Sequence, residues 1–299
     1  ACHANIPLVE LWETVRTWMV KNGVGPLSAH KGMGEKVGKV HNPYGGDQAH
    51  RGDWWPAEVP KYDQPDVIFF AGCTGSFRQQ QIPQTGVRVL NRAGVKMNIL
   101  GADEWCCSSP LLRTGDTTHS LECAERIVEK ADGMGAKDMV MTCSGCYKTI
   151  STDFGTYYAK VGQNVYHFTQ YVNNLIKTRK LPLLQPFNHK VTYHDPCHLG
   201  RHCEVYEPPR QVIAQFPGVD FQEMKYNRQF SHCCGGGGGV RAAYPEESAK
   251  IADTRLDEAD FADVIITTCP FCVTNLGAQA KDRDVKVVDL VELVDEHLQ

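Results

Sequence analysis

The sequence lacks several features that would place it in other classes of protein. It contains no run of about 18 apolar residues, which a membrane-spanning helix requires, and no signal peptide is visible in it. Its 31 basic and 35 acidic residues give a net charge of −4, without the basic excess of a nucleic-acid-binding protein. The composition therefore argues against nucleic acid as a partner and is that of an ordinary globular chain.

The one glycine-rich stretch, Gly235–Gly239, also lacks the residues that two familiar loops need. It has neither the Lys-Ser/Thr pair of a phosphate-binding P-loop nor the spaced glycines of a dinucleotide-binding fingerprint. Because it directly follows Cys233 and Cys234, we interpret it as backbone whose N–H groups approach sulfur ligands and which leaves room for a substrate.

Cysteine, in contrast, is abundant. Thirteen cysteines occur in 299 residues, an odd number in a chain long enough for two domains with cores of their own. Small secreted proteins use disulfides because they lack such a core. We therefore expect free thiols that bind a metal centre in a reducing compartment.

Ten of the thirteen cysteines form two similar sets, each with a single cysteine, an adjacent pair and a Cys-x-x-Cys motif. The gaps between these parts are 32 and 35 residues in the first set and 35 and 34 in the second. The offset of 124 to 127 residues between the sets indicates an internal repeat. The first set is Cys73, Cys106, Cys107, Cys143 and Cys146, and the second is Cys197, Cys233, Cys234, Cys269 and Cys272.

Thiolates are soft ligands that select zinc, copper(I) or iron–sulfur clusters. A structural zinc ion takes four ligands, and a cubane four-iron cluster takes four cysteines. Five cysteines per set exceed both, and two adjacent cysteines reach two irons of a larger cluster more easily than they chelate one zinc ion. The pattern favours an iron–sulfur cluster, with zinc or free thiols as the alternatives.

Short apolar runs alternate with helical patterns and predict an α/β fold with parallel strands. We expect two pseudo-symmetric cysteine-rich domains, 66–184 and 185–299, each a small, mainly parallel sheet with flanking helices. Strands are expected at 66–73, 95–100, 138–143, about 165, 190–194, 219–224, 263–268 and 285–288. Helices are expected at 84–93, 117–131, 209–216 and 246–258, at the C-terminus, and after the short strand in the segment that ends at residue 175.

Residues 1–65 precede these domains. An amphipathic helix is predicted at 6–20, followed by an irregular linker over 22–65 that wraps a domain surface. Because the chain begins with Ala1-Cys2, we expect a fragment in which Cys2 is the last ligand of an upstream ferredoxin-like cysteine run, or else a free cysteine.

Four of the predicted strands end close to a cysteine. Since open α/β sheets bind ligands at the carboxyl ends of their strands, each set should gather at one place. Histidines flank the second set and titrate near neutral pH, which suits them to proton delivery or to hydrogen bonding with the ligands. These histidines are His194, His198, His202 and His232.

These residues resemble the cysteine-rich "CCG" domain, which occurs in pairs in the catalytic iron–sulfur subunit of heterodisulfide reductases. The resemblance covers the chain from about residue 66 to its end. The chain is similar to the fused, membrane-associated branch of the heterodisulfide reductase family and to a subunit of the sulfite-reduction-linked membrane complex. The motifs that carry it are Gly72-Cys73-Thr74, Glu104-Trp105-Cys106-Cys107, His194-Asp195-Pro196-Cys197-His198, Cys233-Cys234-Gly235-Gly236 and Cys269-Pro270-Phe271-Cys272.

The resemblance implies a noncubane [4Fe-4S] cluster held by the five cysteines of a set, hence one or two clusters with all ten cysteines as ligands. It also implies reduction of a mixed disulfide at such a cluster. Ser108 follows the first cysteine pair where the family has glycine, and we expect its side chain to narrow that site. We therefore expect the second site to perform the chemistry, with catalytic roles for Cys233, Cys234, His198 and His232.

The resemblance implies an iron–sulfur oxidoreductase subunit that reduces a heterodisulfide or a related disulfide or trisulfide. Because free thiolates need a reducing compartment, we expect the protein in the cytoplasm, with any membrane association through a partner subunit. The implied partners are a disulfide-containing small molecule or small protein, a ferredoxin-like domain or subunit, and a membrane cytochrome b or flavoprotein subunit. An electron-transfer subunit of a glycolate-, lactate- or quinone-linked complex is the alternative function, and a zinc-stapled structural subunit is a third.

Overall fold

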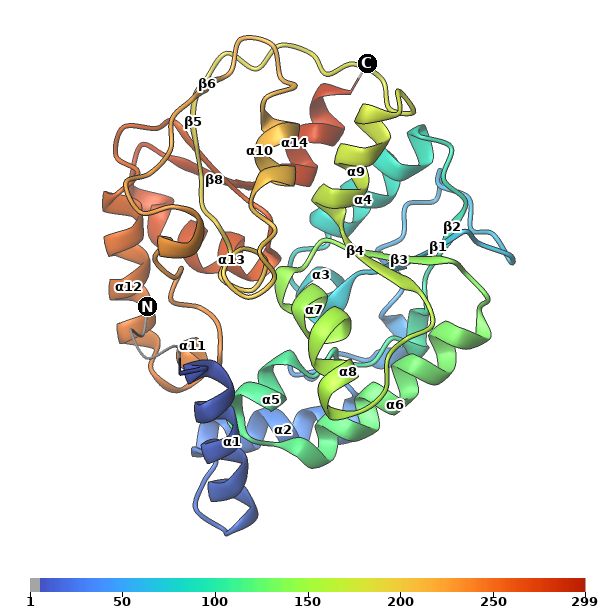
Figure 1. Cartoon of the computed structure of the whole chain (residues 1–299), viewed down its shortest axis with the longest axis vertical. Coiled ribbons are helices and arrows are strands. Elements are labelled where there is room, and N and C mark those ends of the chain that lie inside the picture. The colour runs from blue at the N-terminus through green and yellow to red at the C-terminus, as the bar shows by residue number, and fades with distance from the viewer. Residues whose placement is uncertain (1–5, 299) are drawn as a thin grey trace.

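The computed structural model describes residues 6–298 and contains two four-stranded parallel sheets (Figure 1). Their strand orders are β2-β1-β3-β4 and β6-β5-β7-β8, so the second sheet repeats the topology of the first. The strands are β1 (Val67–Phe70), β2 (Met97–Asn98), β3 (Asp138–Met141), β4 (Asn164–His167), β5 (Lys190–Tyr193), β6 (Asp220–Phe221), β7 (Val264–Thr267) and β8 (Lys286–Asp289). This confirms the predicted pair of α/β units.

The central strands of each sheet end level with each other. Strand β1 pairs with β3 from Val67 opposite Asp138 to Phe70 opposite Met141. Because the strands are parallel and in this register, the loops that follow them leave the sheet side by side. The equivalent pairing of β5 with β7 does the same in the second half of the chain.

Each sheet lies between two hydrophobic cores. On β1, Val67 and Phe69 belong to a core that both halves of the chain share, whereas Ile68 and Phe70 face a core made mostly by the first half. The side chains of β7 divide in the same way between the shared core and a core of the second half. Each half of the chain thus contributes most of one core, and the two halves share a third.

Two pairs of helices enclose the shared core, and each pair joins the two halves of the chain. Helix α4 (Gln81–Arg92) packs on α14 (Leu290–His297), and α9 (Phe168–Lys177) packs on α10 (Glu207–Ile213) (Figure 1). The pairing fixes how the two sheets face each other.

The other helices cover the outer faces of the sheets or follow the cysteine loops. Helices α3, α7 and α13 meet near the centre of the molecule (Figure 1). The bounds are α3 (Gly72–Phe77), α5 (Ser109–Thr114), α6 (Thr117–Gly133), α7 (Ser144–Lys148), α8 (Phe154–Tyr157), α11 (Val240–Ala243), α12 (Pro245–Asp257) and α13 (Pro270–Gln279).

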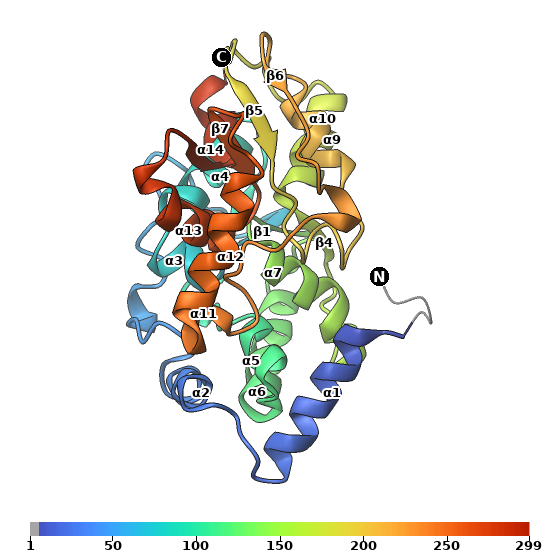
Figure 2. The same cartoon turned by 90° about the vertical axis from the view of Figure 1, so that its left-hand side faces the viewer.

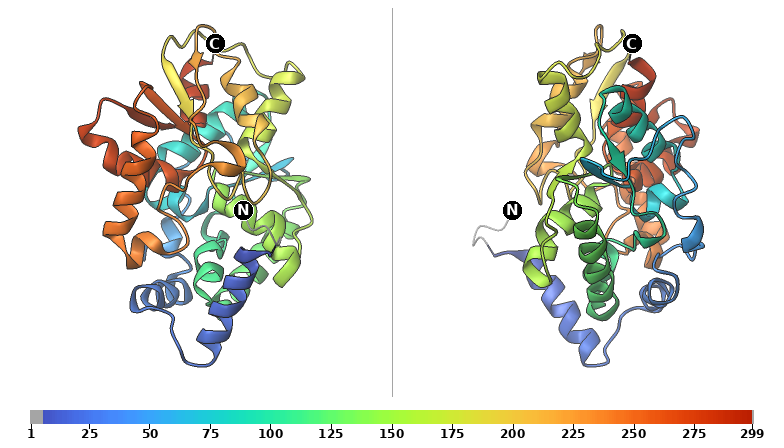
Figure 3. Two further views of the ribbon diagram at one scale, coloured as in Figure 1. Left: turned by 60° about the vertical axis from the view of Figure 1, so that its left-hand side comes forward. Right: turned by 90° about the vertical axis from the view of Figure 1, so that its right-hand side faces the viewer.

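The segment before the first sheet contains two helices, α1 (Leu8–Lys21) and α2 (Ser28–Val40), which lie at one end of the molecule near α5 and α6 (Figures 2 and 3). Helix α1 was predicted, but the irregular linker predicted over 22–65 is wrong for residues 28–40. A β-carbon at Gly34 would lie 2.3 Å from Oδ2 of Asp116, and one at Gly38 would lie 2.6 Å from Nε2 of His119. The glycines that weaken helix propensity here allow α2 to pack closely on the start of α6.

Strands β2 and β6 are shorter than the predicted runs, since only two residues of each pair with a neighbouring strand. Cys2 lies outside the described residues. Within residues 6–298, none of the helices combines the length and the apolar character that crossing a membrane requires.

Candidate functional site

Both cysteine sets lie at the carboxyl ends of their sheets and face one cavity of about 640 Å³. Nine of the ten predicted ligands line this cavity. The tenth, Cys233, is the sequence neighbour of Cys234, which does line it. The lining cysteines are Cys73, Cys106, Cys107, Cys143, Cys146, Cys197, Cys234, Cys269 and Cys272. The cavity thus brings the two halves of the repeat together at one place.

The thiols of each set contact one another in the same order. In the first set the contacts run from Cys73 to Cys106, Cys107, Cys146 and Cys143. The second set repeats this order, from Cys197 to Cys233, Cys234, Cys272 and Cys269. In the second set the Sγ atoms of Cys234 and Cys272 are 3.4 Å apart.

A thiol contact between Cys143 and Cys269 joins the two sets. Cys143 is the N-cap residue of α7, which follows β3, and Cys269 is the N-cap residue of α13, which follows β7. The pKa of Cys269 lies well below its usual value. Hydrogen bonds from the thiols of Cys143 and Cys272 are the main cause, and the backbone N–H groups of Cys272 and Phe271 contribute less. The two sets therefore form one continuous group of sulfur atoms.

One cysteine of each adjacent pair is readily ionised. Hydrogen bonds with Cys106 and Cys146 lower the pKa of Cys107 to about 6. Hydrogen bonds with Cys197 and Cys234 lower the pKa of Cys233 to about 2. Since the thiolate is the form that binds metals, Cys107 and Cys233 are suited to ligation, whereas their hydrogen bonds with Cys106 and Cys234 raise the pKa of those two neighbours.

Glycines let the backbone approach these sulfurs. Gly72 has a φ of +72°, and a β-carbon there would lie 2.8 Å from Sγ of Cys146. In the second set, the backbone N–H of Gly235 donates a hydrogen bond to Sγ of Cys233 at 3.3 Å. This is the backbone-to-sulfur contact that the glycine-rich stretch predicted.

Ser108 occupies the place of Gly235 in the first set and does not narrow the cavity as the sequence suggested. It has a φ of +68°, in the left-handed region that Gly235 also adopts. Its Oγ donates a hydrogen bond to the carbonyl oxygen of Ser120 at 3.0 Å, and it is absent from the cavity lining. Ser109 and Pro110 line the cavity instead.

A buried ion pair holds the loop that carries Cys73. Arg51 donates hydrogen bonds from Nη2 to Oε1 of Glu104 at 2.8 Å and from both Nη atoms to Sγ of Cys73 at 3.5 Å. The Glu104 carboxylate also accepts hydrogen bonds from the backbone N–H groups of Ala71 and Gly72. Sequence reasoning missed Arg51, because it lies in the segment interpreted as a linker and no motif marks it.

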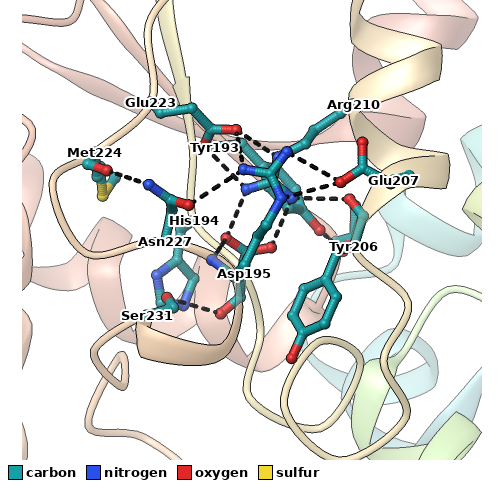
Figure 4. A network of polar contacts seen from close by, with 12 residues as sticks. Tyr193, His194, Asp195, Tyr206, Glu207, Arg210, Glu223, Met224, Asn227 and Ser231 are labelled. Carbon is teal, nitrogen blue, oxygen red and sulfur yellow. Dashed lines mark hydrogen bonds and ion pairs between the residues drawn. The ribbon is translucent and has the colours of Figure 1, made fainter.

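A second charged network holds the loop that carries Cys197 (Figure 4). The buried carboxylate of Asp195 accepts two hydrogen bonds from Arg210, both at 2.8 Å, and one from the backbone N–H of Arg228. Arg210 also pairs with Glu223. Ser231, which precedes the adjacent cysteine pair, donates from Oγ to the backbone carbonyl of Asp195 at 3.3 Å. The network therefore ties two parts of the second set together.

The flanking histidines have different positions. His198 lines the cavity, and burial lowers its pKa to about 3, so its ring is neutral at physiological pH. His202 packs against it with ring centroids 5.4 Å apart. His194 is buried behind the second set. His232 is absent from the cavity lining, with a side chain 47% exposed and hydrogen bonded to Glu258.

The rest of the cavity wall contains three cations. Lys36 comes from α2, Arg78 follows α3, and Arg241 comes from α11. Among residues 6–298, no aspartate or glutamate lines the cavity. Arg241 donates to the amide oxygen of Asn275 at 2.9 Å, and Arg78 lies over the Tyr44 ring. This positive wall was not predicted, because only the fold brings α2 and α11 to the cysteines.

Two halves of the chain match one family model. The model is described as a cysteine-rich domain, CCG, and it matches residues 67–151 and 191–277. These ranges contain all ten cysteines of the two sets. The match confirms the repeat that the cysteine spacing predicts.

Similar proteins include a reductase subunit and a quinone-linked oxidoreductase. A subunit of the dihydromethanophenazine:CoB–CoM heterodisulfide reductase of Methanosarcina barkeri is 40% identical over 305 residues, which covers 99% of this chain and 75% of the relative. The EtfAB:quinone oxidoreductase of Syntrophomonas wolfei is 31% identical, which covers 85% of this chain and 38% of the relative.

A solved structure supports the fold alone. A hypothetical protein from Helicobacter pylori superimposes with a TM-score of 0.53 and 11% sequence identity, over 84% of this chain and 53% of that one. The family assignment rests on the repeated cysteine-rich domain and on the likeness along almost the whole chain. This chain belongs to the CCG cysteine-rich domain family, together with the matching subunit of the heterodisulfide reductases.

Proposed function

We propose that this iron–sulfur oxidoreductase subunit reduces a heterodisulfide, or a related disulfide or trisulfide, in the cavity between its two cysteine sets. The observation that carries the proposal is that nine of ten candidate ligands line one cavity that is also bounded by cations and glycines. Its volume of about 640 Å³ is in the range of small-molecule sites. The likeness to the heterodisulfide reductase subunit supports the same reaction class.

All ten cysteines are proposed as ligands of one or two noncubane [4Fe-4S] clusters. The five contacting thiols of each set exceed the four ligands of a structural zinc ion or of a cubane cluster. All ten are free thiols, as ligation requires. When bound, an iron–sulfur cluster accepts and delivers electrons one at a time.

The reaction breaks one S–S bond. A disulfide R–S–S–R′ takes up two electrons and two protons and becomes R–SH and R′–SH. The electrons are proposed to come from a ferredoxin-like domain or subunit, and the protons from solvent by way of the cavity wall. The protein's part is to bind the disulfide, orient it toward the sulfur group and assist protonation of the departing thiolates.

Lys36, Arg78 and Arg241 are proposed to bind anionic groups of the substrate. Among the described residues, no aspartate or glutamate lines the cavity beside these three cations. These cations are therefore available to a carboxylate, sulfonate or phosphate group of a substrate that enters the cavity. The favoured substrate is a disulfide that carries negative charge.

The second set remains the proposed site of bond cleavage, with Cys233 and Cys234 as its central residues. Gly236 and the three glycines after it line that side of the cavity without side chains. His198 is the histidine whose position supports a catalytic role, as a hydrogen-bond donor to a departing thiolate. His232 lies outside the cavity, so the position gives no support to direct contact with the substrate.

The proposed partners are a ferredoxin-like domain or subunit and a membrane cytochrome b or flavoprotein subunit. The relatives named above are described as a subunit of a reductase and as a quinone-linked oxidoreductase, which supports work within an electron-transfer chain. We propose a cytoplasmic location, with membrane association through a partner, because free thiolates persist in a reducing compartment.

A second candidate is an electron-transfer subunit that breaks no bond and serves a quinone- or flavoprotein-linked complex. The likeness to the EtfAB:quinone oxidoreductase favours it. The two candidates differ in what the cavity does: a disulfide reductase must bind thiols there, whereas an electron relay has no need to do so.

Metal analysis and turnover of the anaerobically purified protein test the proposal. Two four-iron clusters predict about eight irons and matching acid-labile sulfide per chain. The reduced protein should convert an anionic disulfide to two thiols for each pair of electrons consumed. About two zinc ions without sulfide would overturn the cluster, and full iron content with no disulfide reduction would favour the electron-transfer subunit.

A further inference from the structure

A buried histidine behind the second cysteine set has one ring nitrogen with a hydrogen-bond partner and one without a partner among the described residues. His194 directly follows β5 and is 1% exposed. Its Nδ1 accepts a hydrogen bond from Nε of Arg255 at 3.0 Å. Its Nε2 has no hydrogen-bond partner within residues 6–298, although it is fully buried. Buried polar groups without a partner are rare and call for an explanation.

The bond from Arg255 determines where the ring carries its hydrogen. Arginine is protonated at all physiological pH values and can only donate, so Nδ1 of His194 is the acceptor. The neutral ring then carries its single hydrogen on Nε2. Arg255 is itself fixed by hydrogen bonds to the carbonyl oxygen of Tyr226 at 2.9 Å and to Oγ of Ser231 at 3.1 Å.

The ring lies against the second cysteine set. A ring nitrogen of His194 and the Sγ atoms of Cys234 and Cys272 lie within 4.8 Å of one another. A bare nitrogen in this place would suit a metal ion. An Nε2 that carries hydrogen cannot ligate iron, but it can donate a hydrogen bond to sulfur.

We propose that His194 donates its Nε2–H to a sulfur atom of the second iron–sulfur cluster, either a cysteine ligand or an inorganic sulfide, and that Arg255 is the positioning residue that fixes this tautomer. The inference rests on the proposed function in one respect, since it needs a cluster at the second set. It assigns the otherwise unpaired nitrogen a partner of matching chemistry.

The first set has a different donor. Counting back three residues from its first cysteine gives Phe70, whereas the same step from Cys197 gives His194. Phe70 has no side-chain N–H group, and the guanidinium of Arg51 contacts Sγ of Cys73 instead. Hydrogen bonds to the sulfurs are one of the factors that set the reduction potential of an iron–sulfur cluster. The two clusters should therefore be tuned by different side chains.

Two substitutions at His194 and one matched control test the potential. In an EPR-monitored redox titration of the cluster-loaded protein, His194→Leu should shift one cluster to a more negative midpoint potential and leave the other unchanged. His194→Gln, which keeps an amide N–H donor, should restore much of the shift. Phe70→Leu, the control at the equivalent place in the first half, should leave the second cluster's potential unchanged.

A measurement on the unmutated protein covers the case in which a variant does not fold or load. With ¹⁵N-labelled histidine, pulsed EPR should show a weak nitrogen coupling of a hydrogen-bonded ring at one cluster. A strong coupling, as for a nitrogen bound to iron, would overturn the inference, as would no coupling or an unshifted potential in His194→Leu. Iron and sulfide analysis of the unmutated protein decides separately whether the proposed clusters exist.

Discussion

Replacing Glu104 by alanine should destabilise the protein by about 3–5 kcal/mol, the usual cost of breaking a buried ion pair. The Glu104 carboxylate accepts hydrogen bonds from Nε and Nη2 of Arg51, at 3.2 and 2.8 Å, and from the N–H groups of Ala71 and Gly72, at 3.1 and 2.9 Å. The side chains of Arg51 and Glu104 are 1% and 3% exposed. Glu104→Ala leaves a buried cation and two backbone donors without their partner.

This loss is a large share of the roughly 5–15 kcal/mol by which native proteins are typically stable. A double variant, Arg51→Met with Glu104→Leu, removes both charges and should cost less than Glu104→Ala alone. No buried charge is then left unpaired, although two backbone N–H groups lose their acceptor and Sγ of Cys73 loses its donor. The exposed pair of Lys250 and Glu247, at 69% and 60% exposure, is the control. Glu247→Ala should cost no more than about 1 kcal/mol.

Urea unfolding of the metal-free proteins under anaerobic, reducing conditions measures these differences without the contribution of a bound cluster. The expected order of stability is Glu247→Ala, then the double variant, then Glu104→Ala. A cost below about 1 kcal/mol for Glu104→Ala, or a double variant less stable than Glu104→Ala, would refute the reasoning.

Three further sets of measurements on variants test the site. Cys234→Ser should abolish disulfide reduction, whereas Cys107→Ser should slow it and leave the second cluster's EPR signal; the reverse result would exchange the roles of the two sets. Arg241→Ala should raise the KM for an anionic disulfide roughly tenfold or more, since a charged hydrogen bond contributes about 1.5–3 kcal/mol. The KM for a neutral disulfide should stay unchanged. Equal effects on the two substrates would contradict the role of the positive wall. Gly72→Ala should lower the iron content by about four per chain, because its β-carbon would meet a cysteine sulfur, whereas Gly94→Ala, at a φ of +73° with nothing within 4 Å, should keep full iron.

The parts of the fold that the sequence predicted are those where local pattern and tertiary environment agree. The apolar run over 66–73 becomes the fully buried β1, and the regular spacing of the cysteines places both sets at the ends of parallel strands. Helix α2 was missed because its glycines have low helix propensity. Their value lies in a close contact with α6, which is distant in sequence.

The site shows the same division. The ten cysteines could be predicted as ligands from the sequence, because a thiol is a metal ligand in itself and the spacing of the cysteines marks the two sets. Arg51, Lys36 and Arg241 could not, because each acts through a contact that only the folded chain creates. Ser108 shows the opposite error: its identity suggested a narrowed site, but its left-handed backbone turns the hydroxyl toward Ser120.

The central claim is that the two sets hold iron–sulfur clusters at which a disulfide is reduced. EPR of the anaerobically purified, oxidised protein, recorded with and without an added thiol product, tests it most directly. We predict a paramagnetic species that appears only with the thiol, in a protein that contains about eight irons per chain. A spectrum that the thiol does not change would contradict the disulfide chemistry, and a protein with zinc and no sulfide would contradict the clusters themselves.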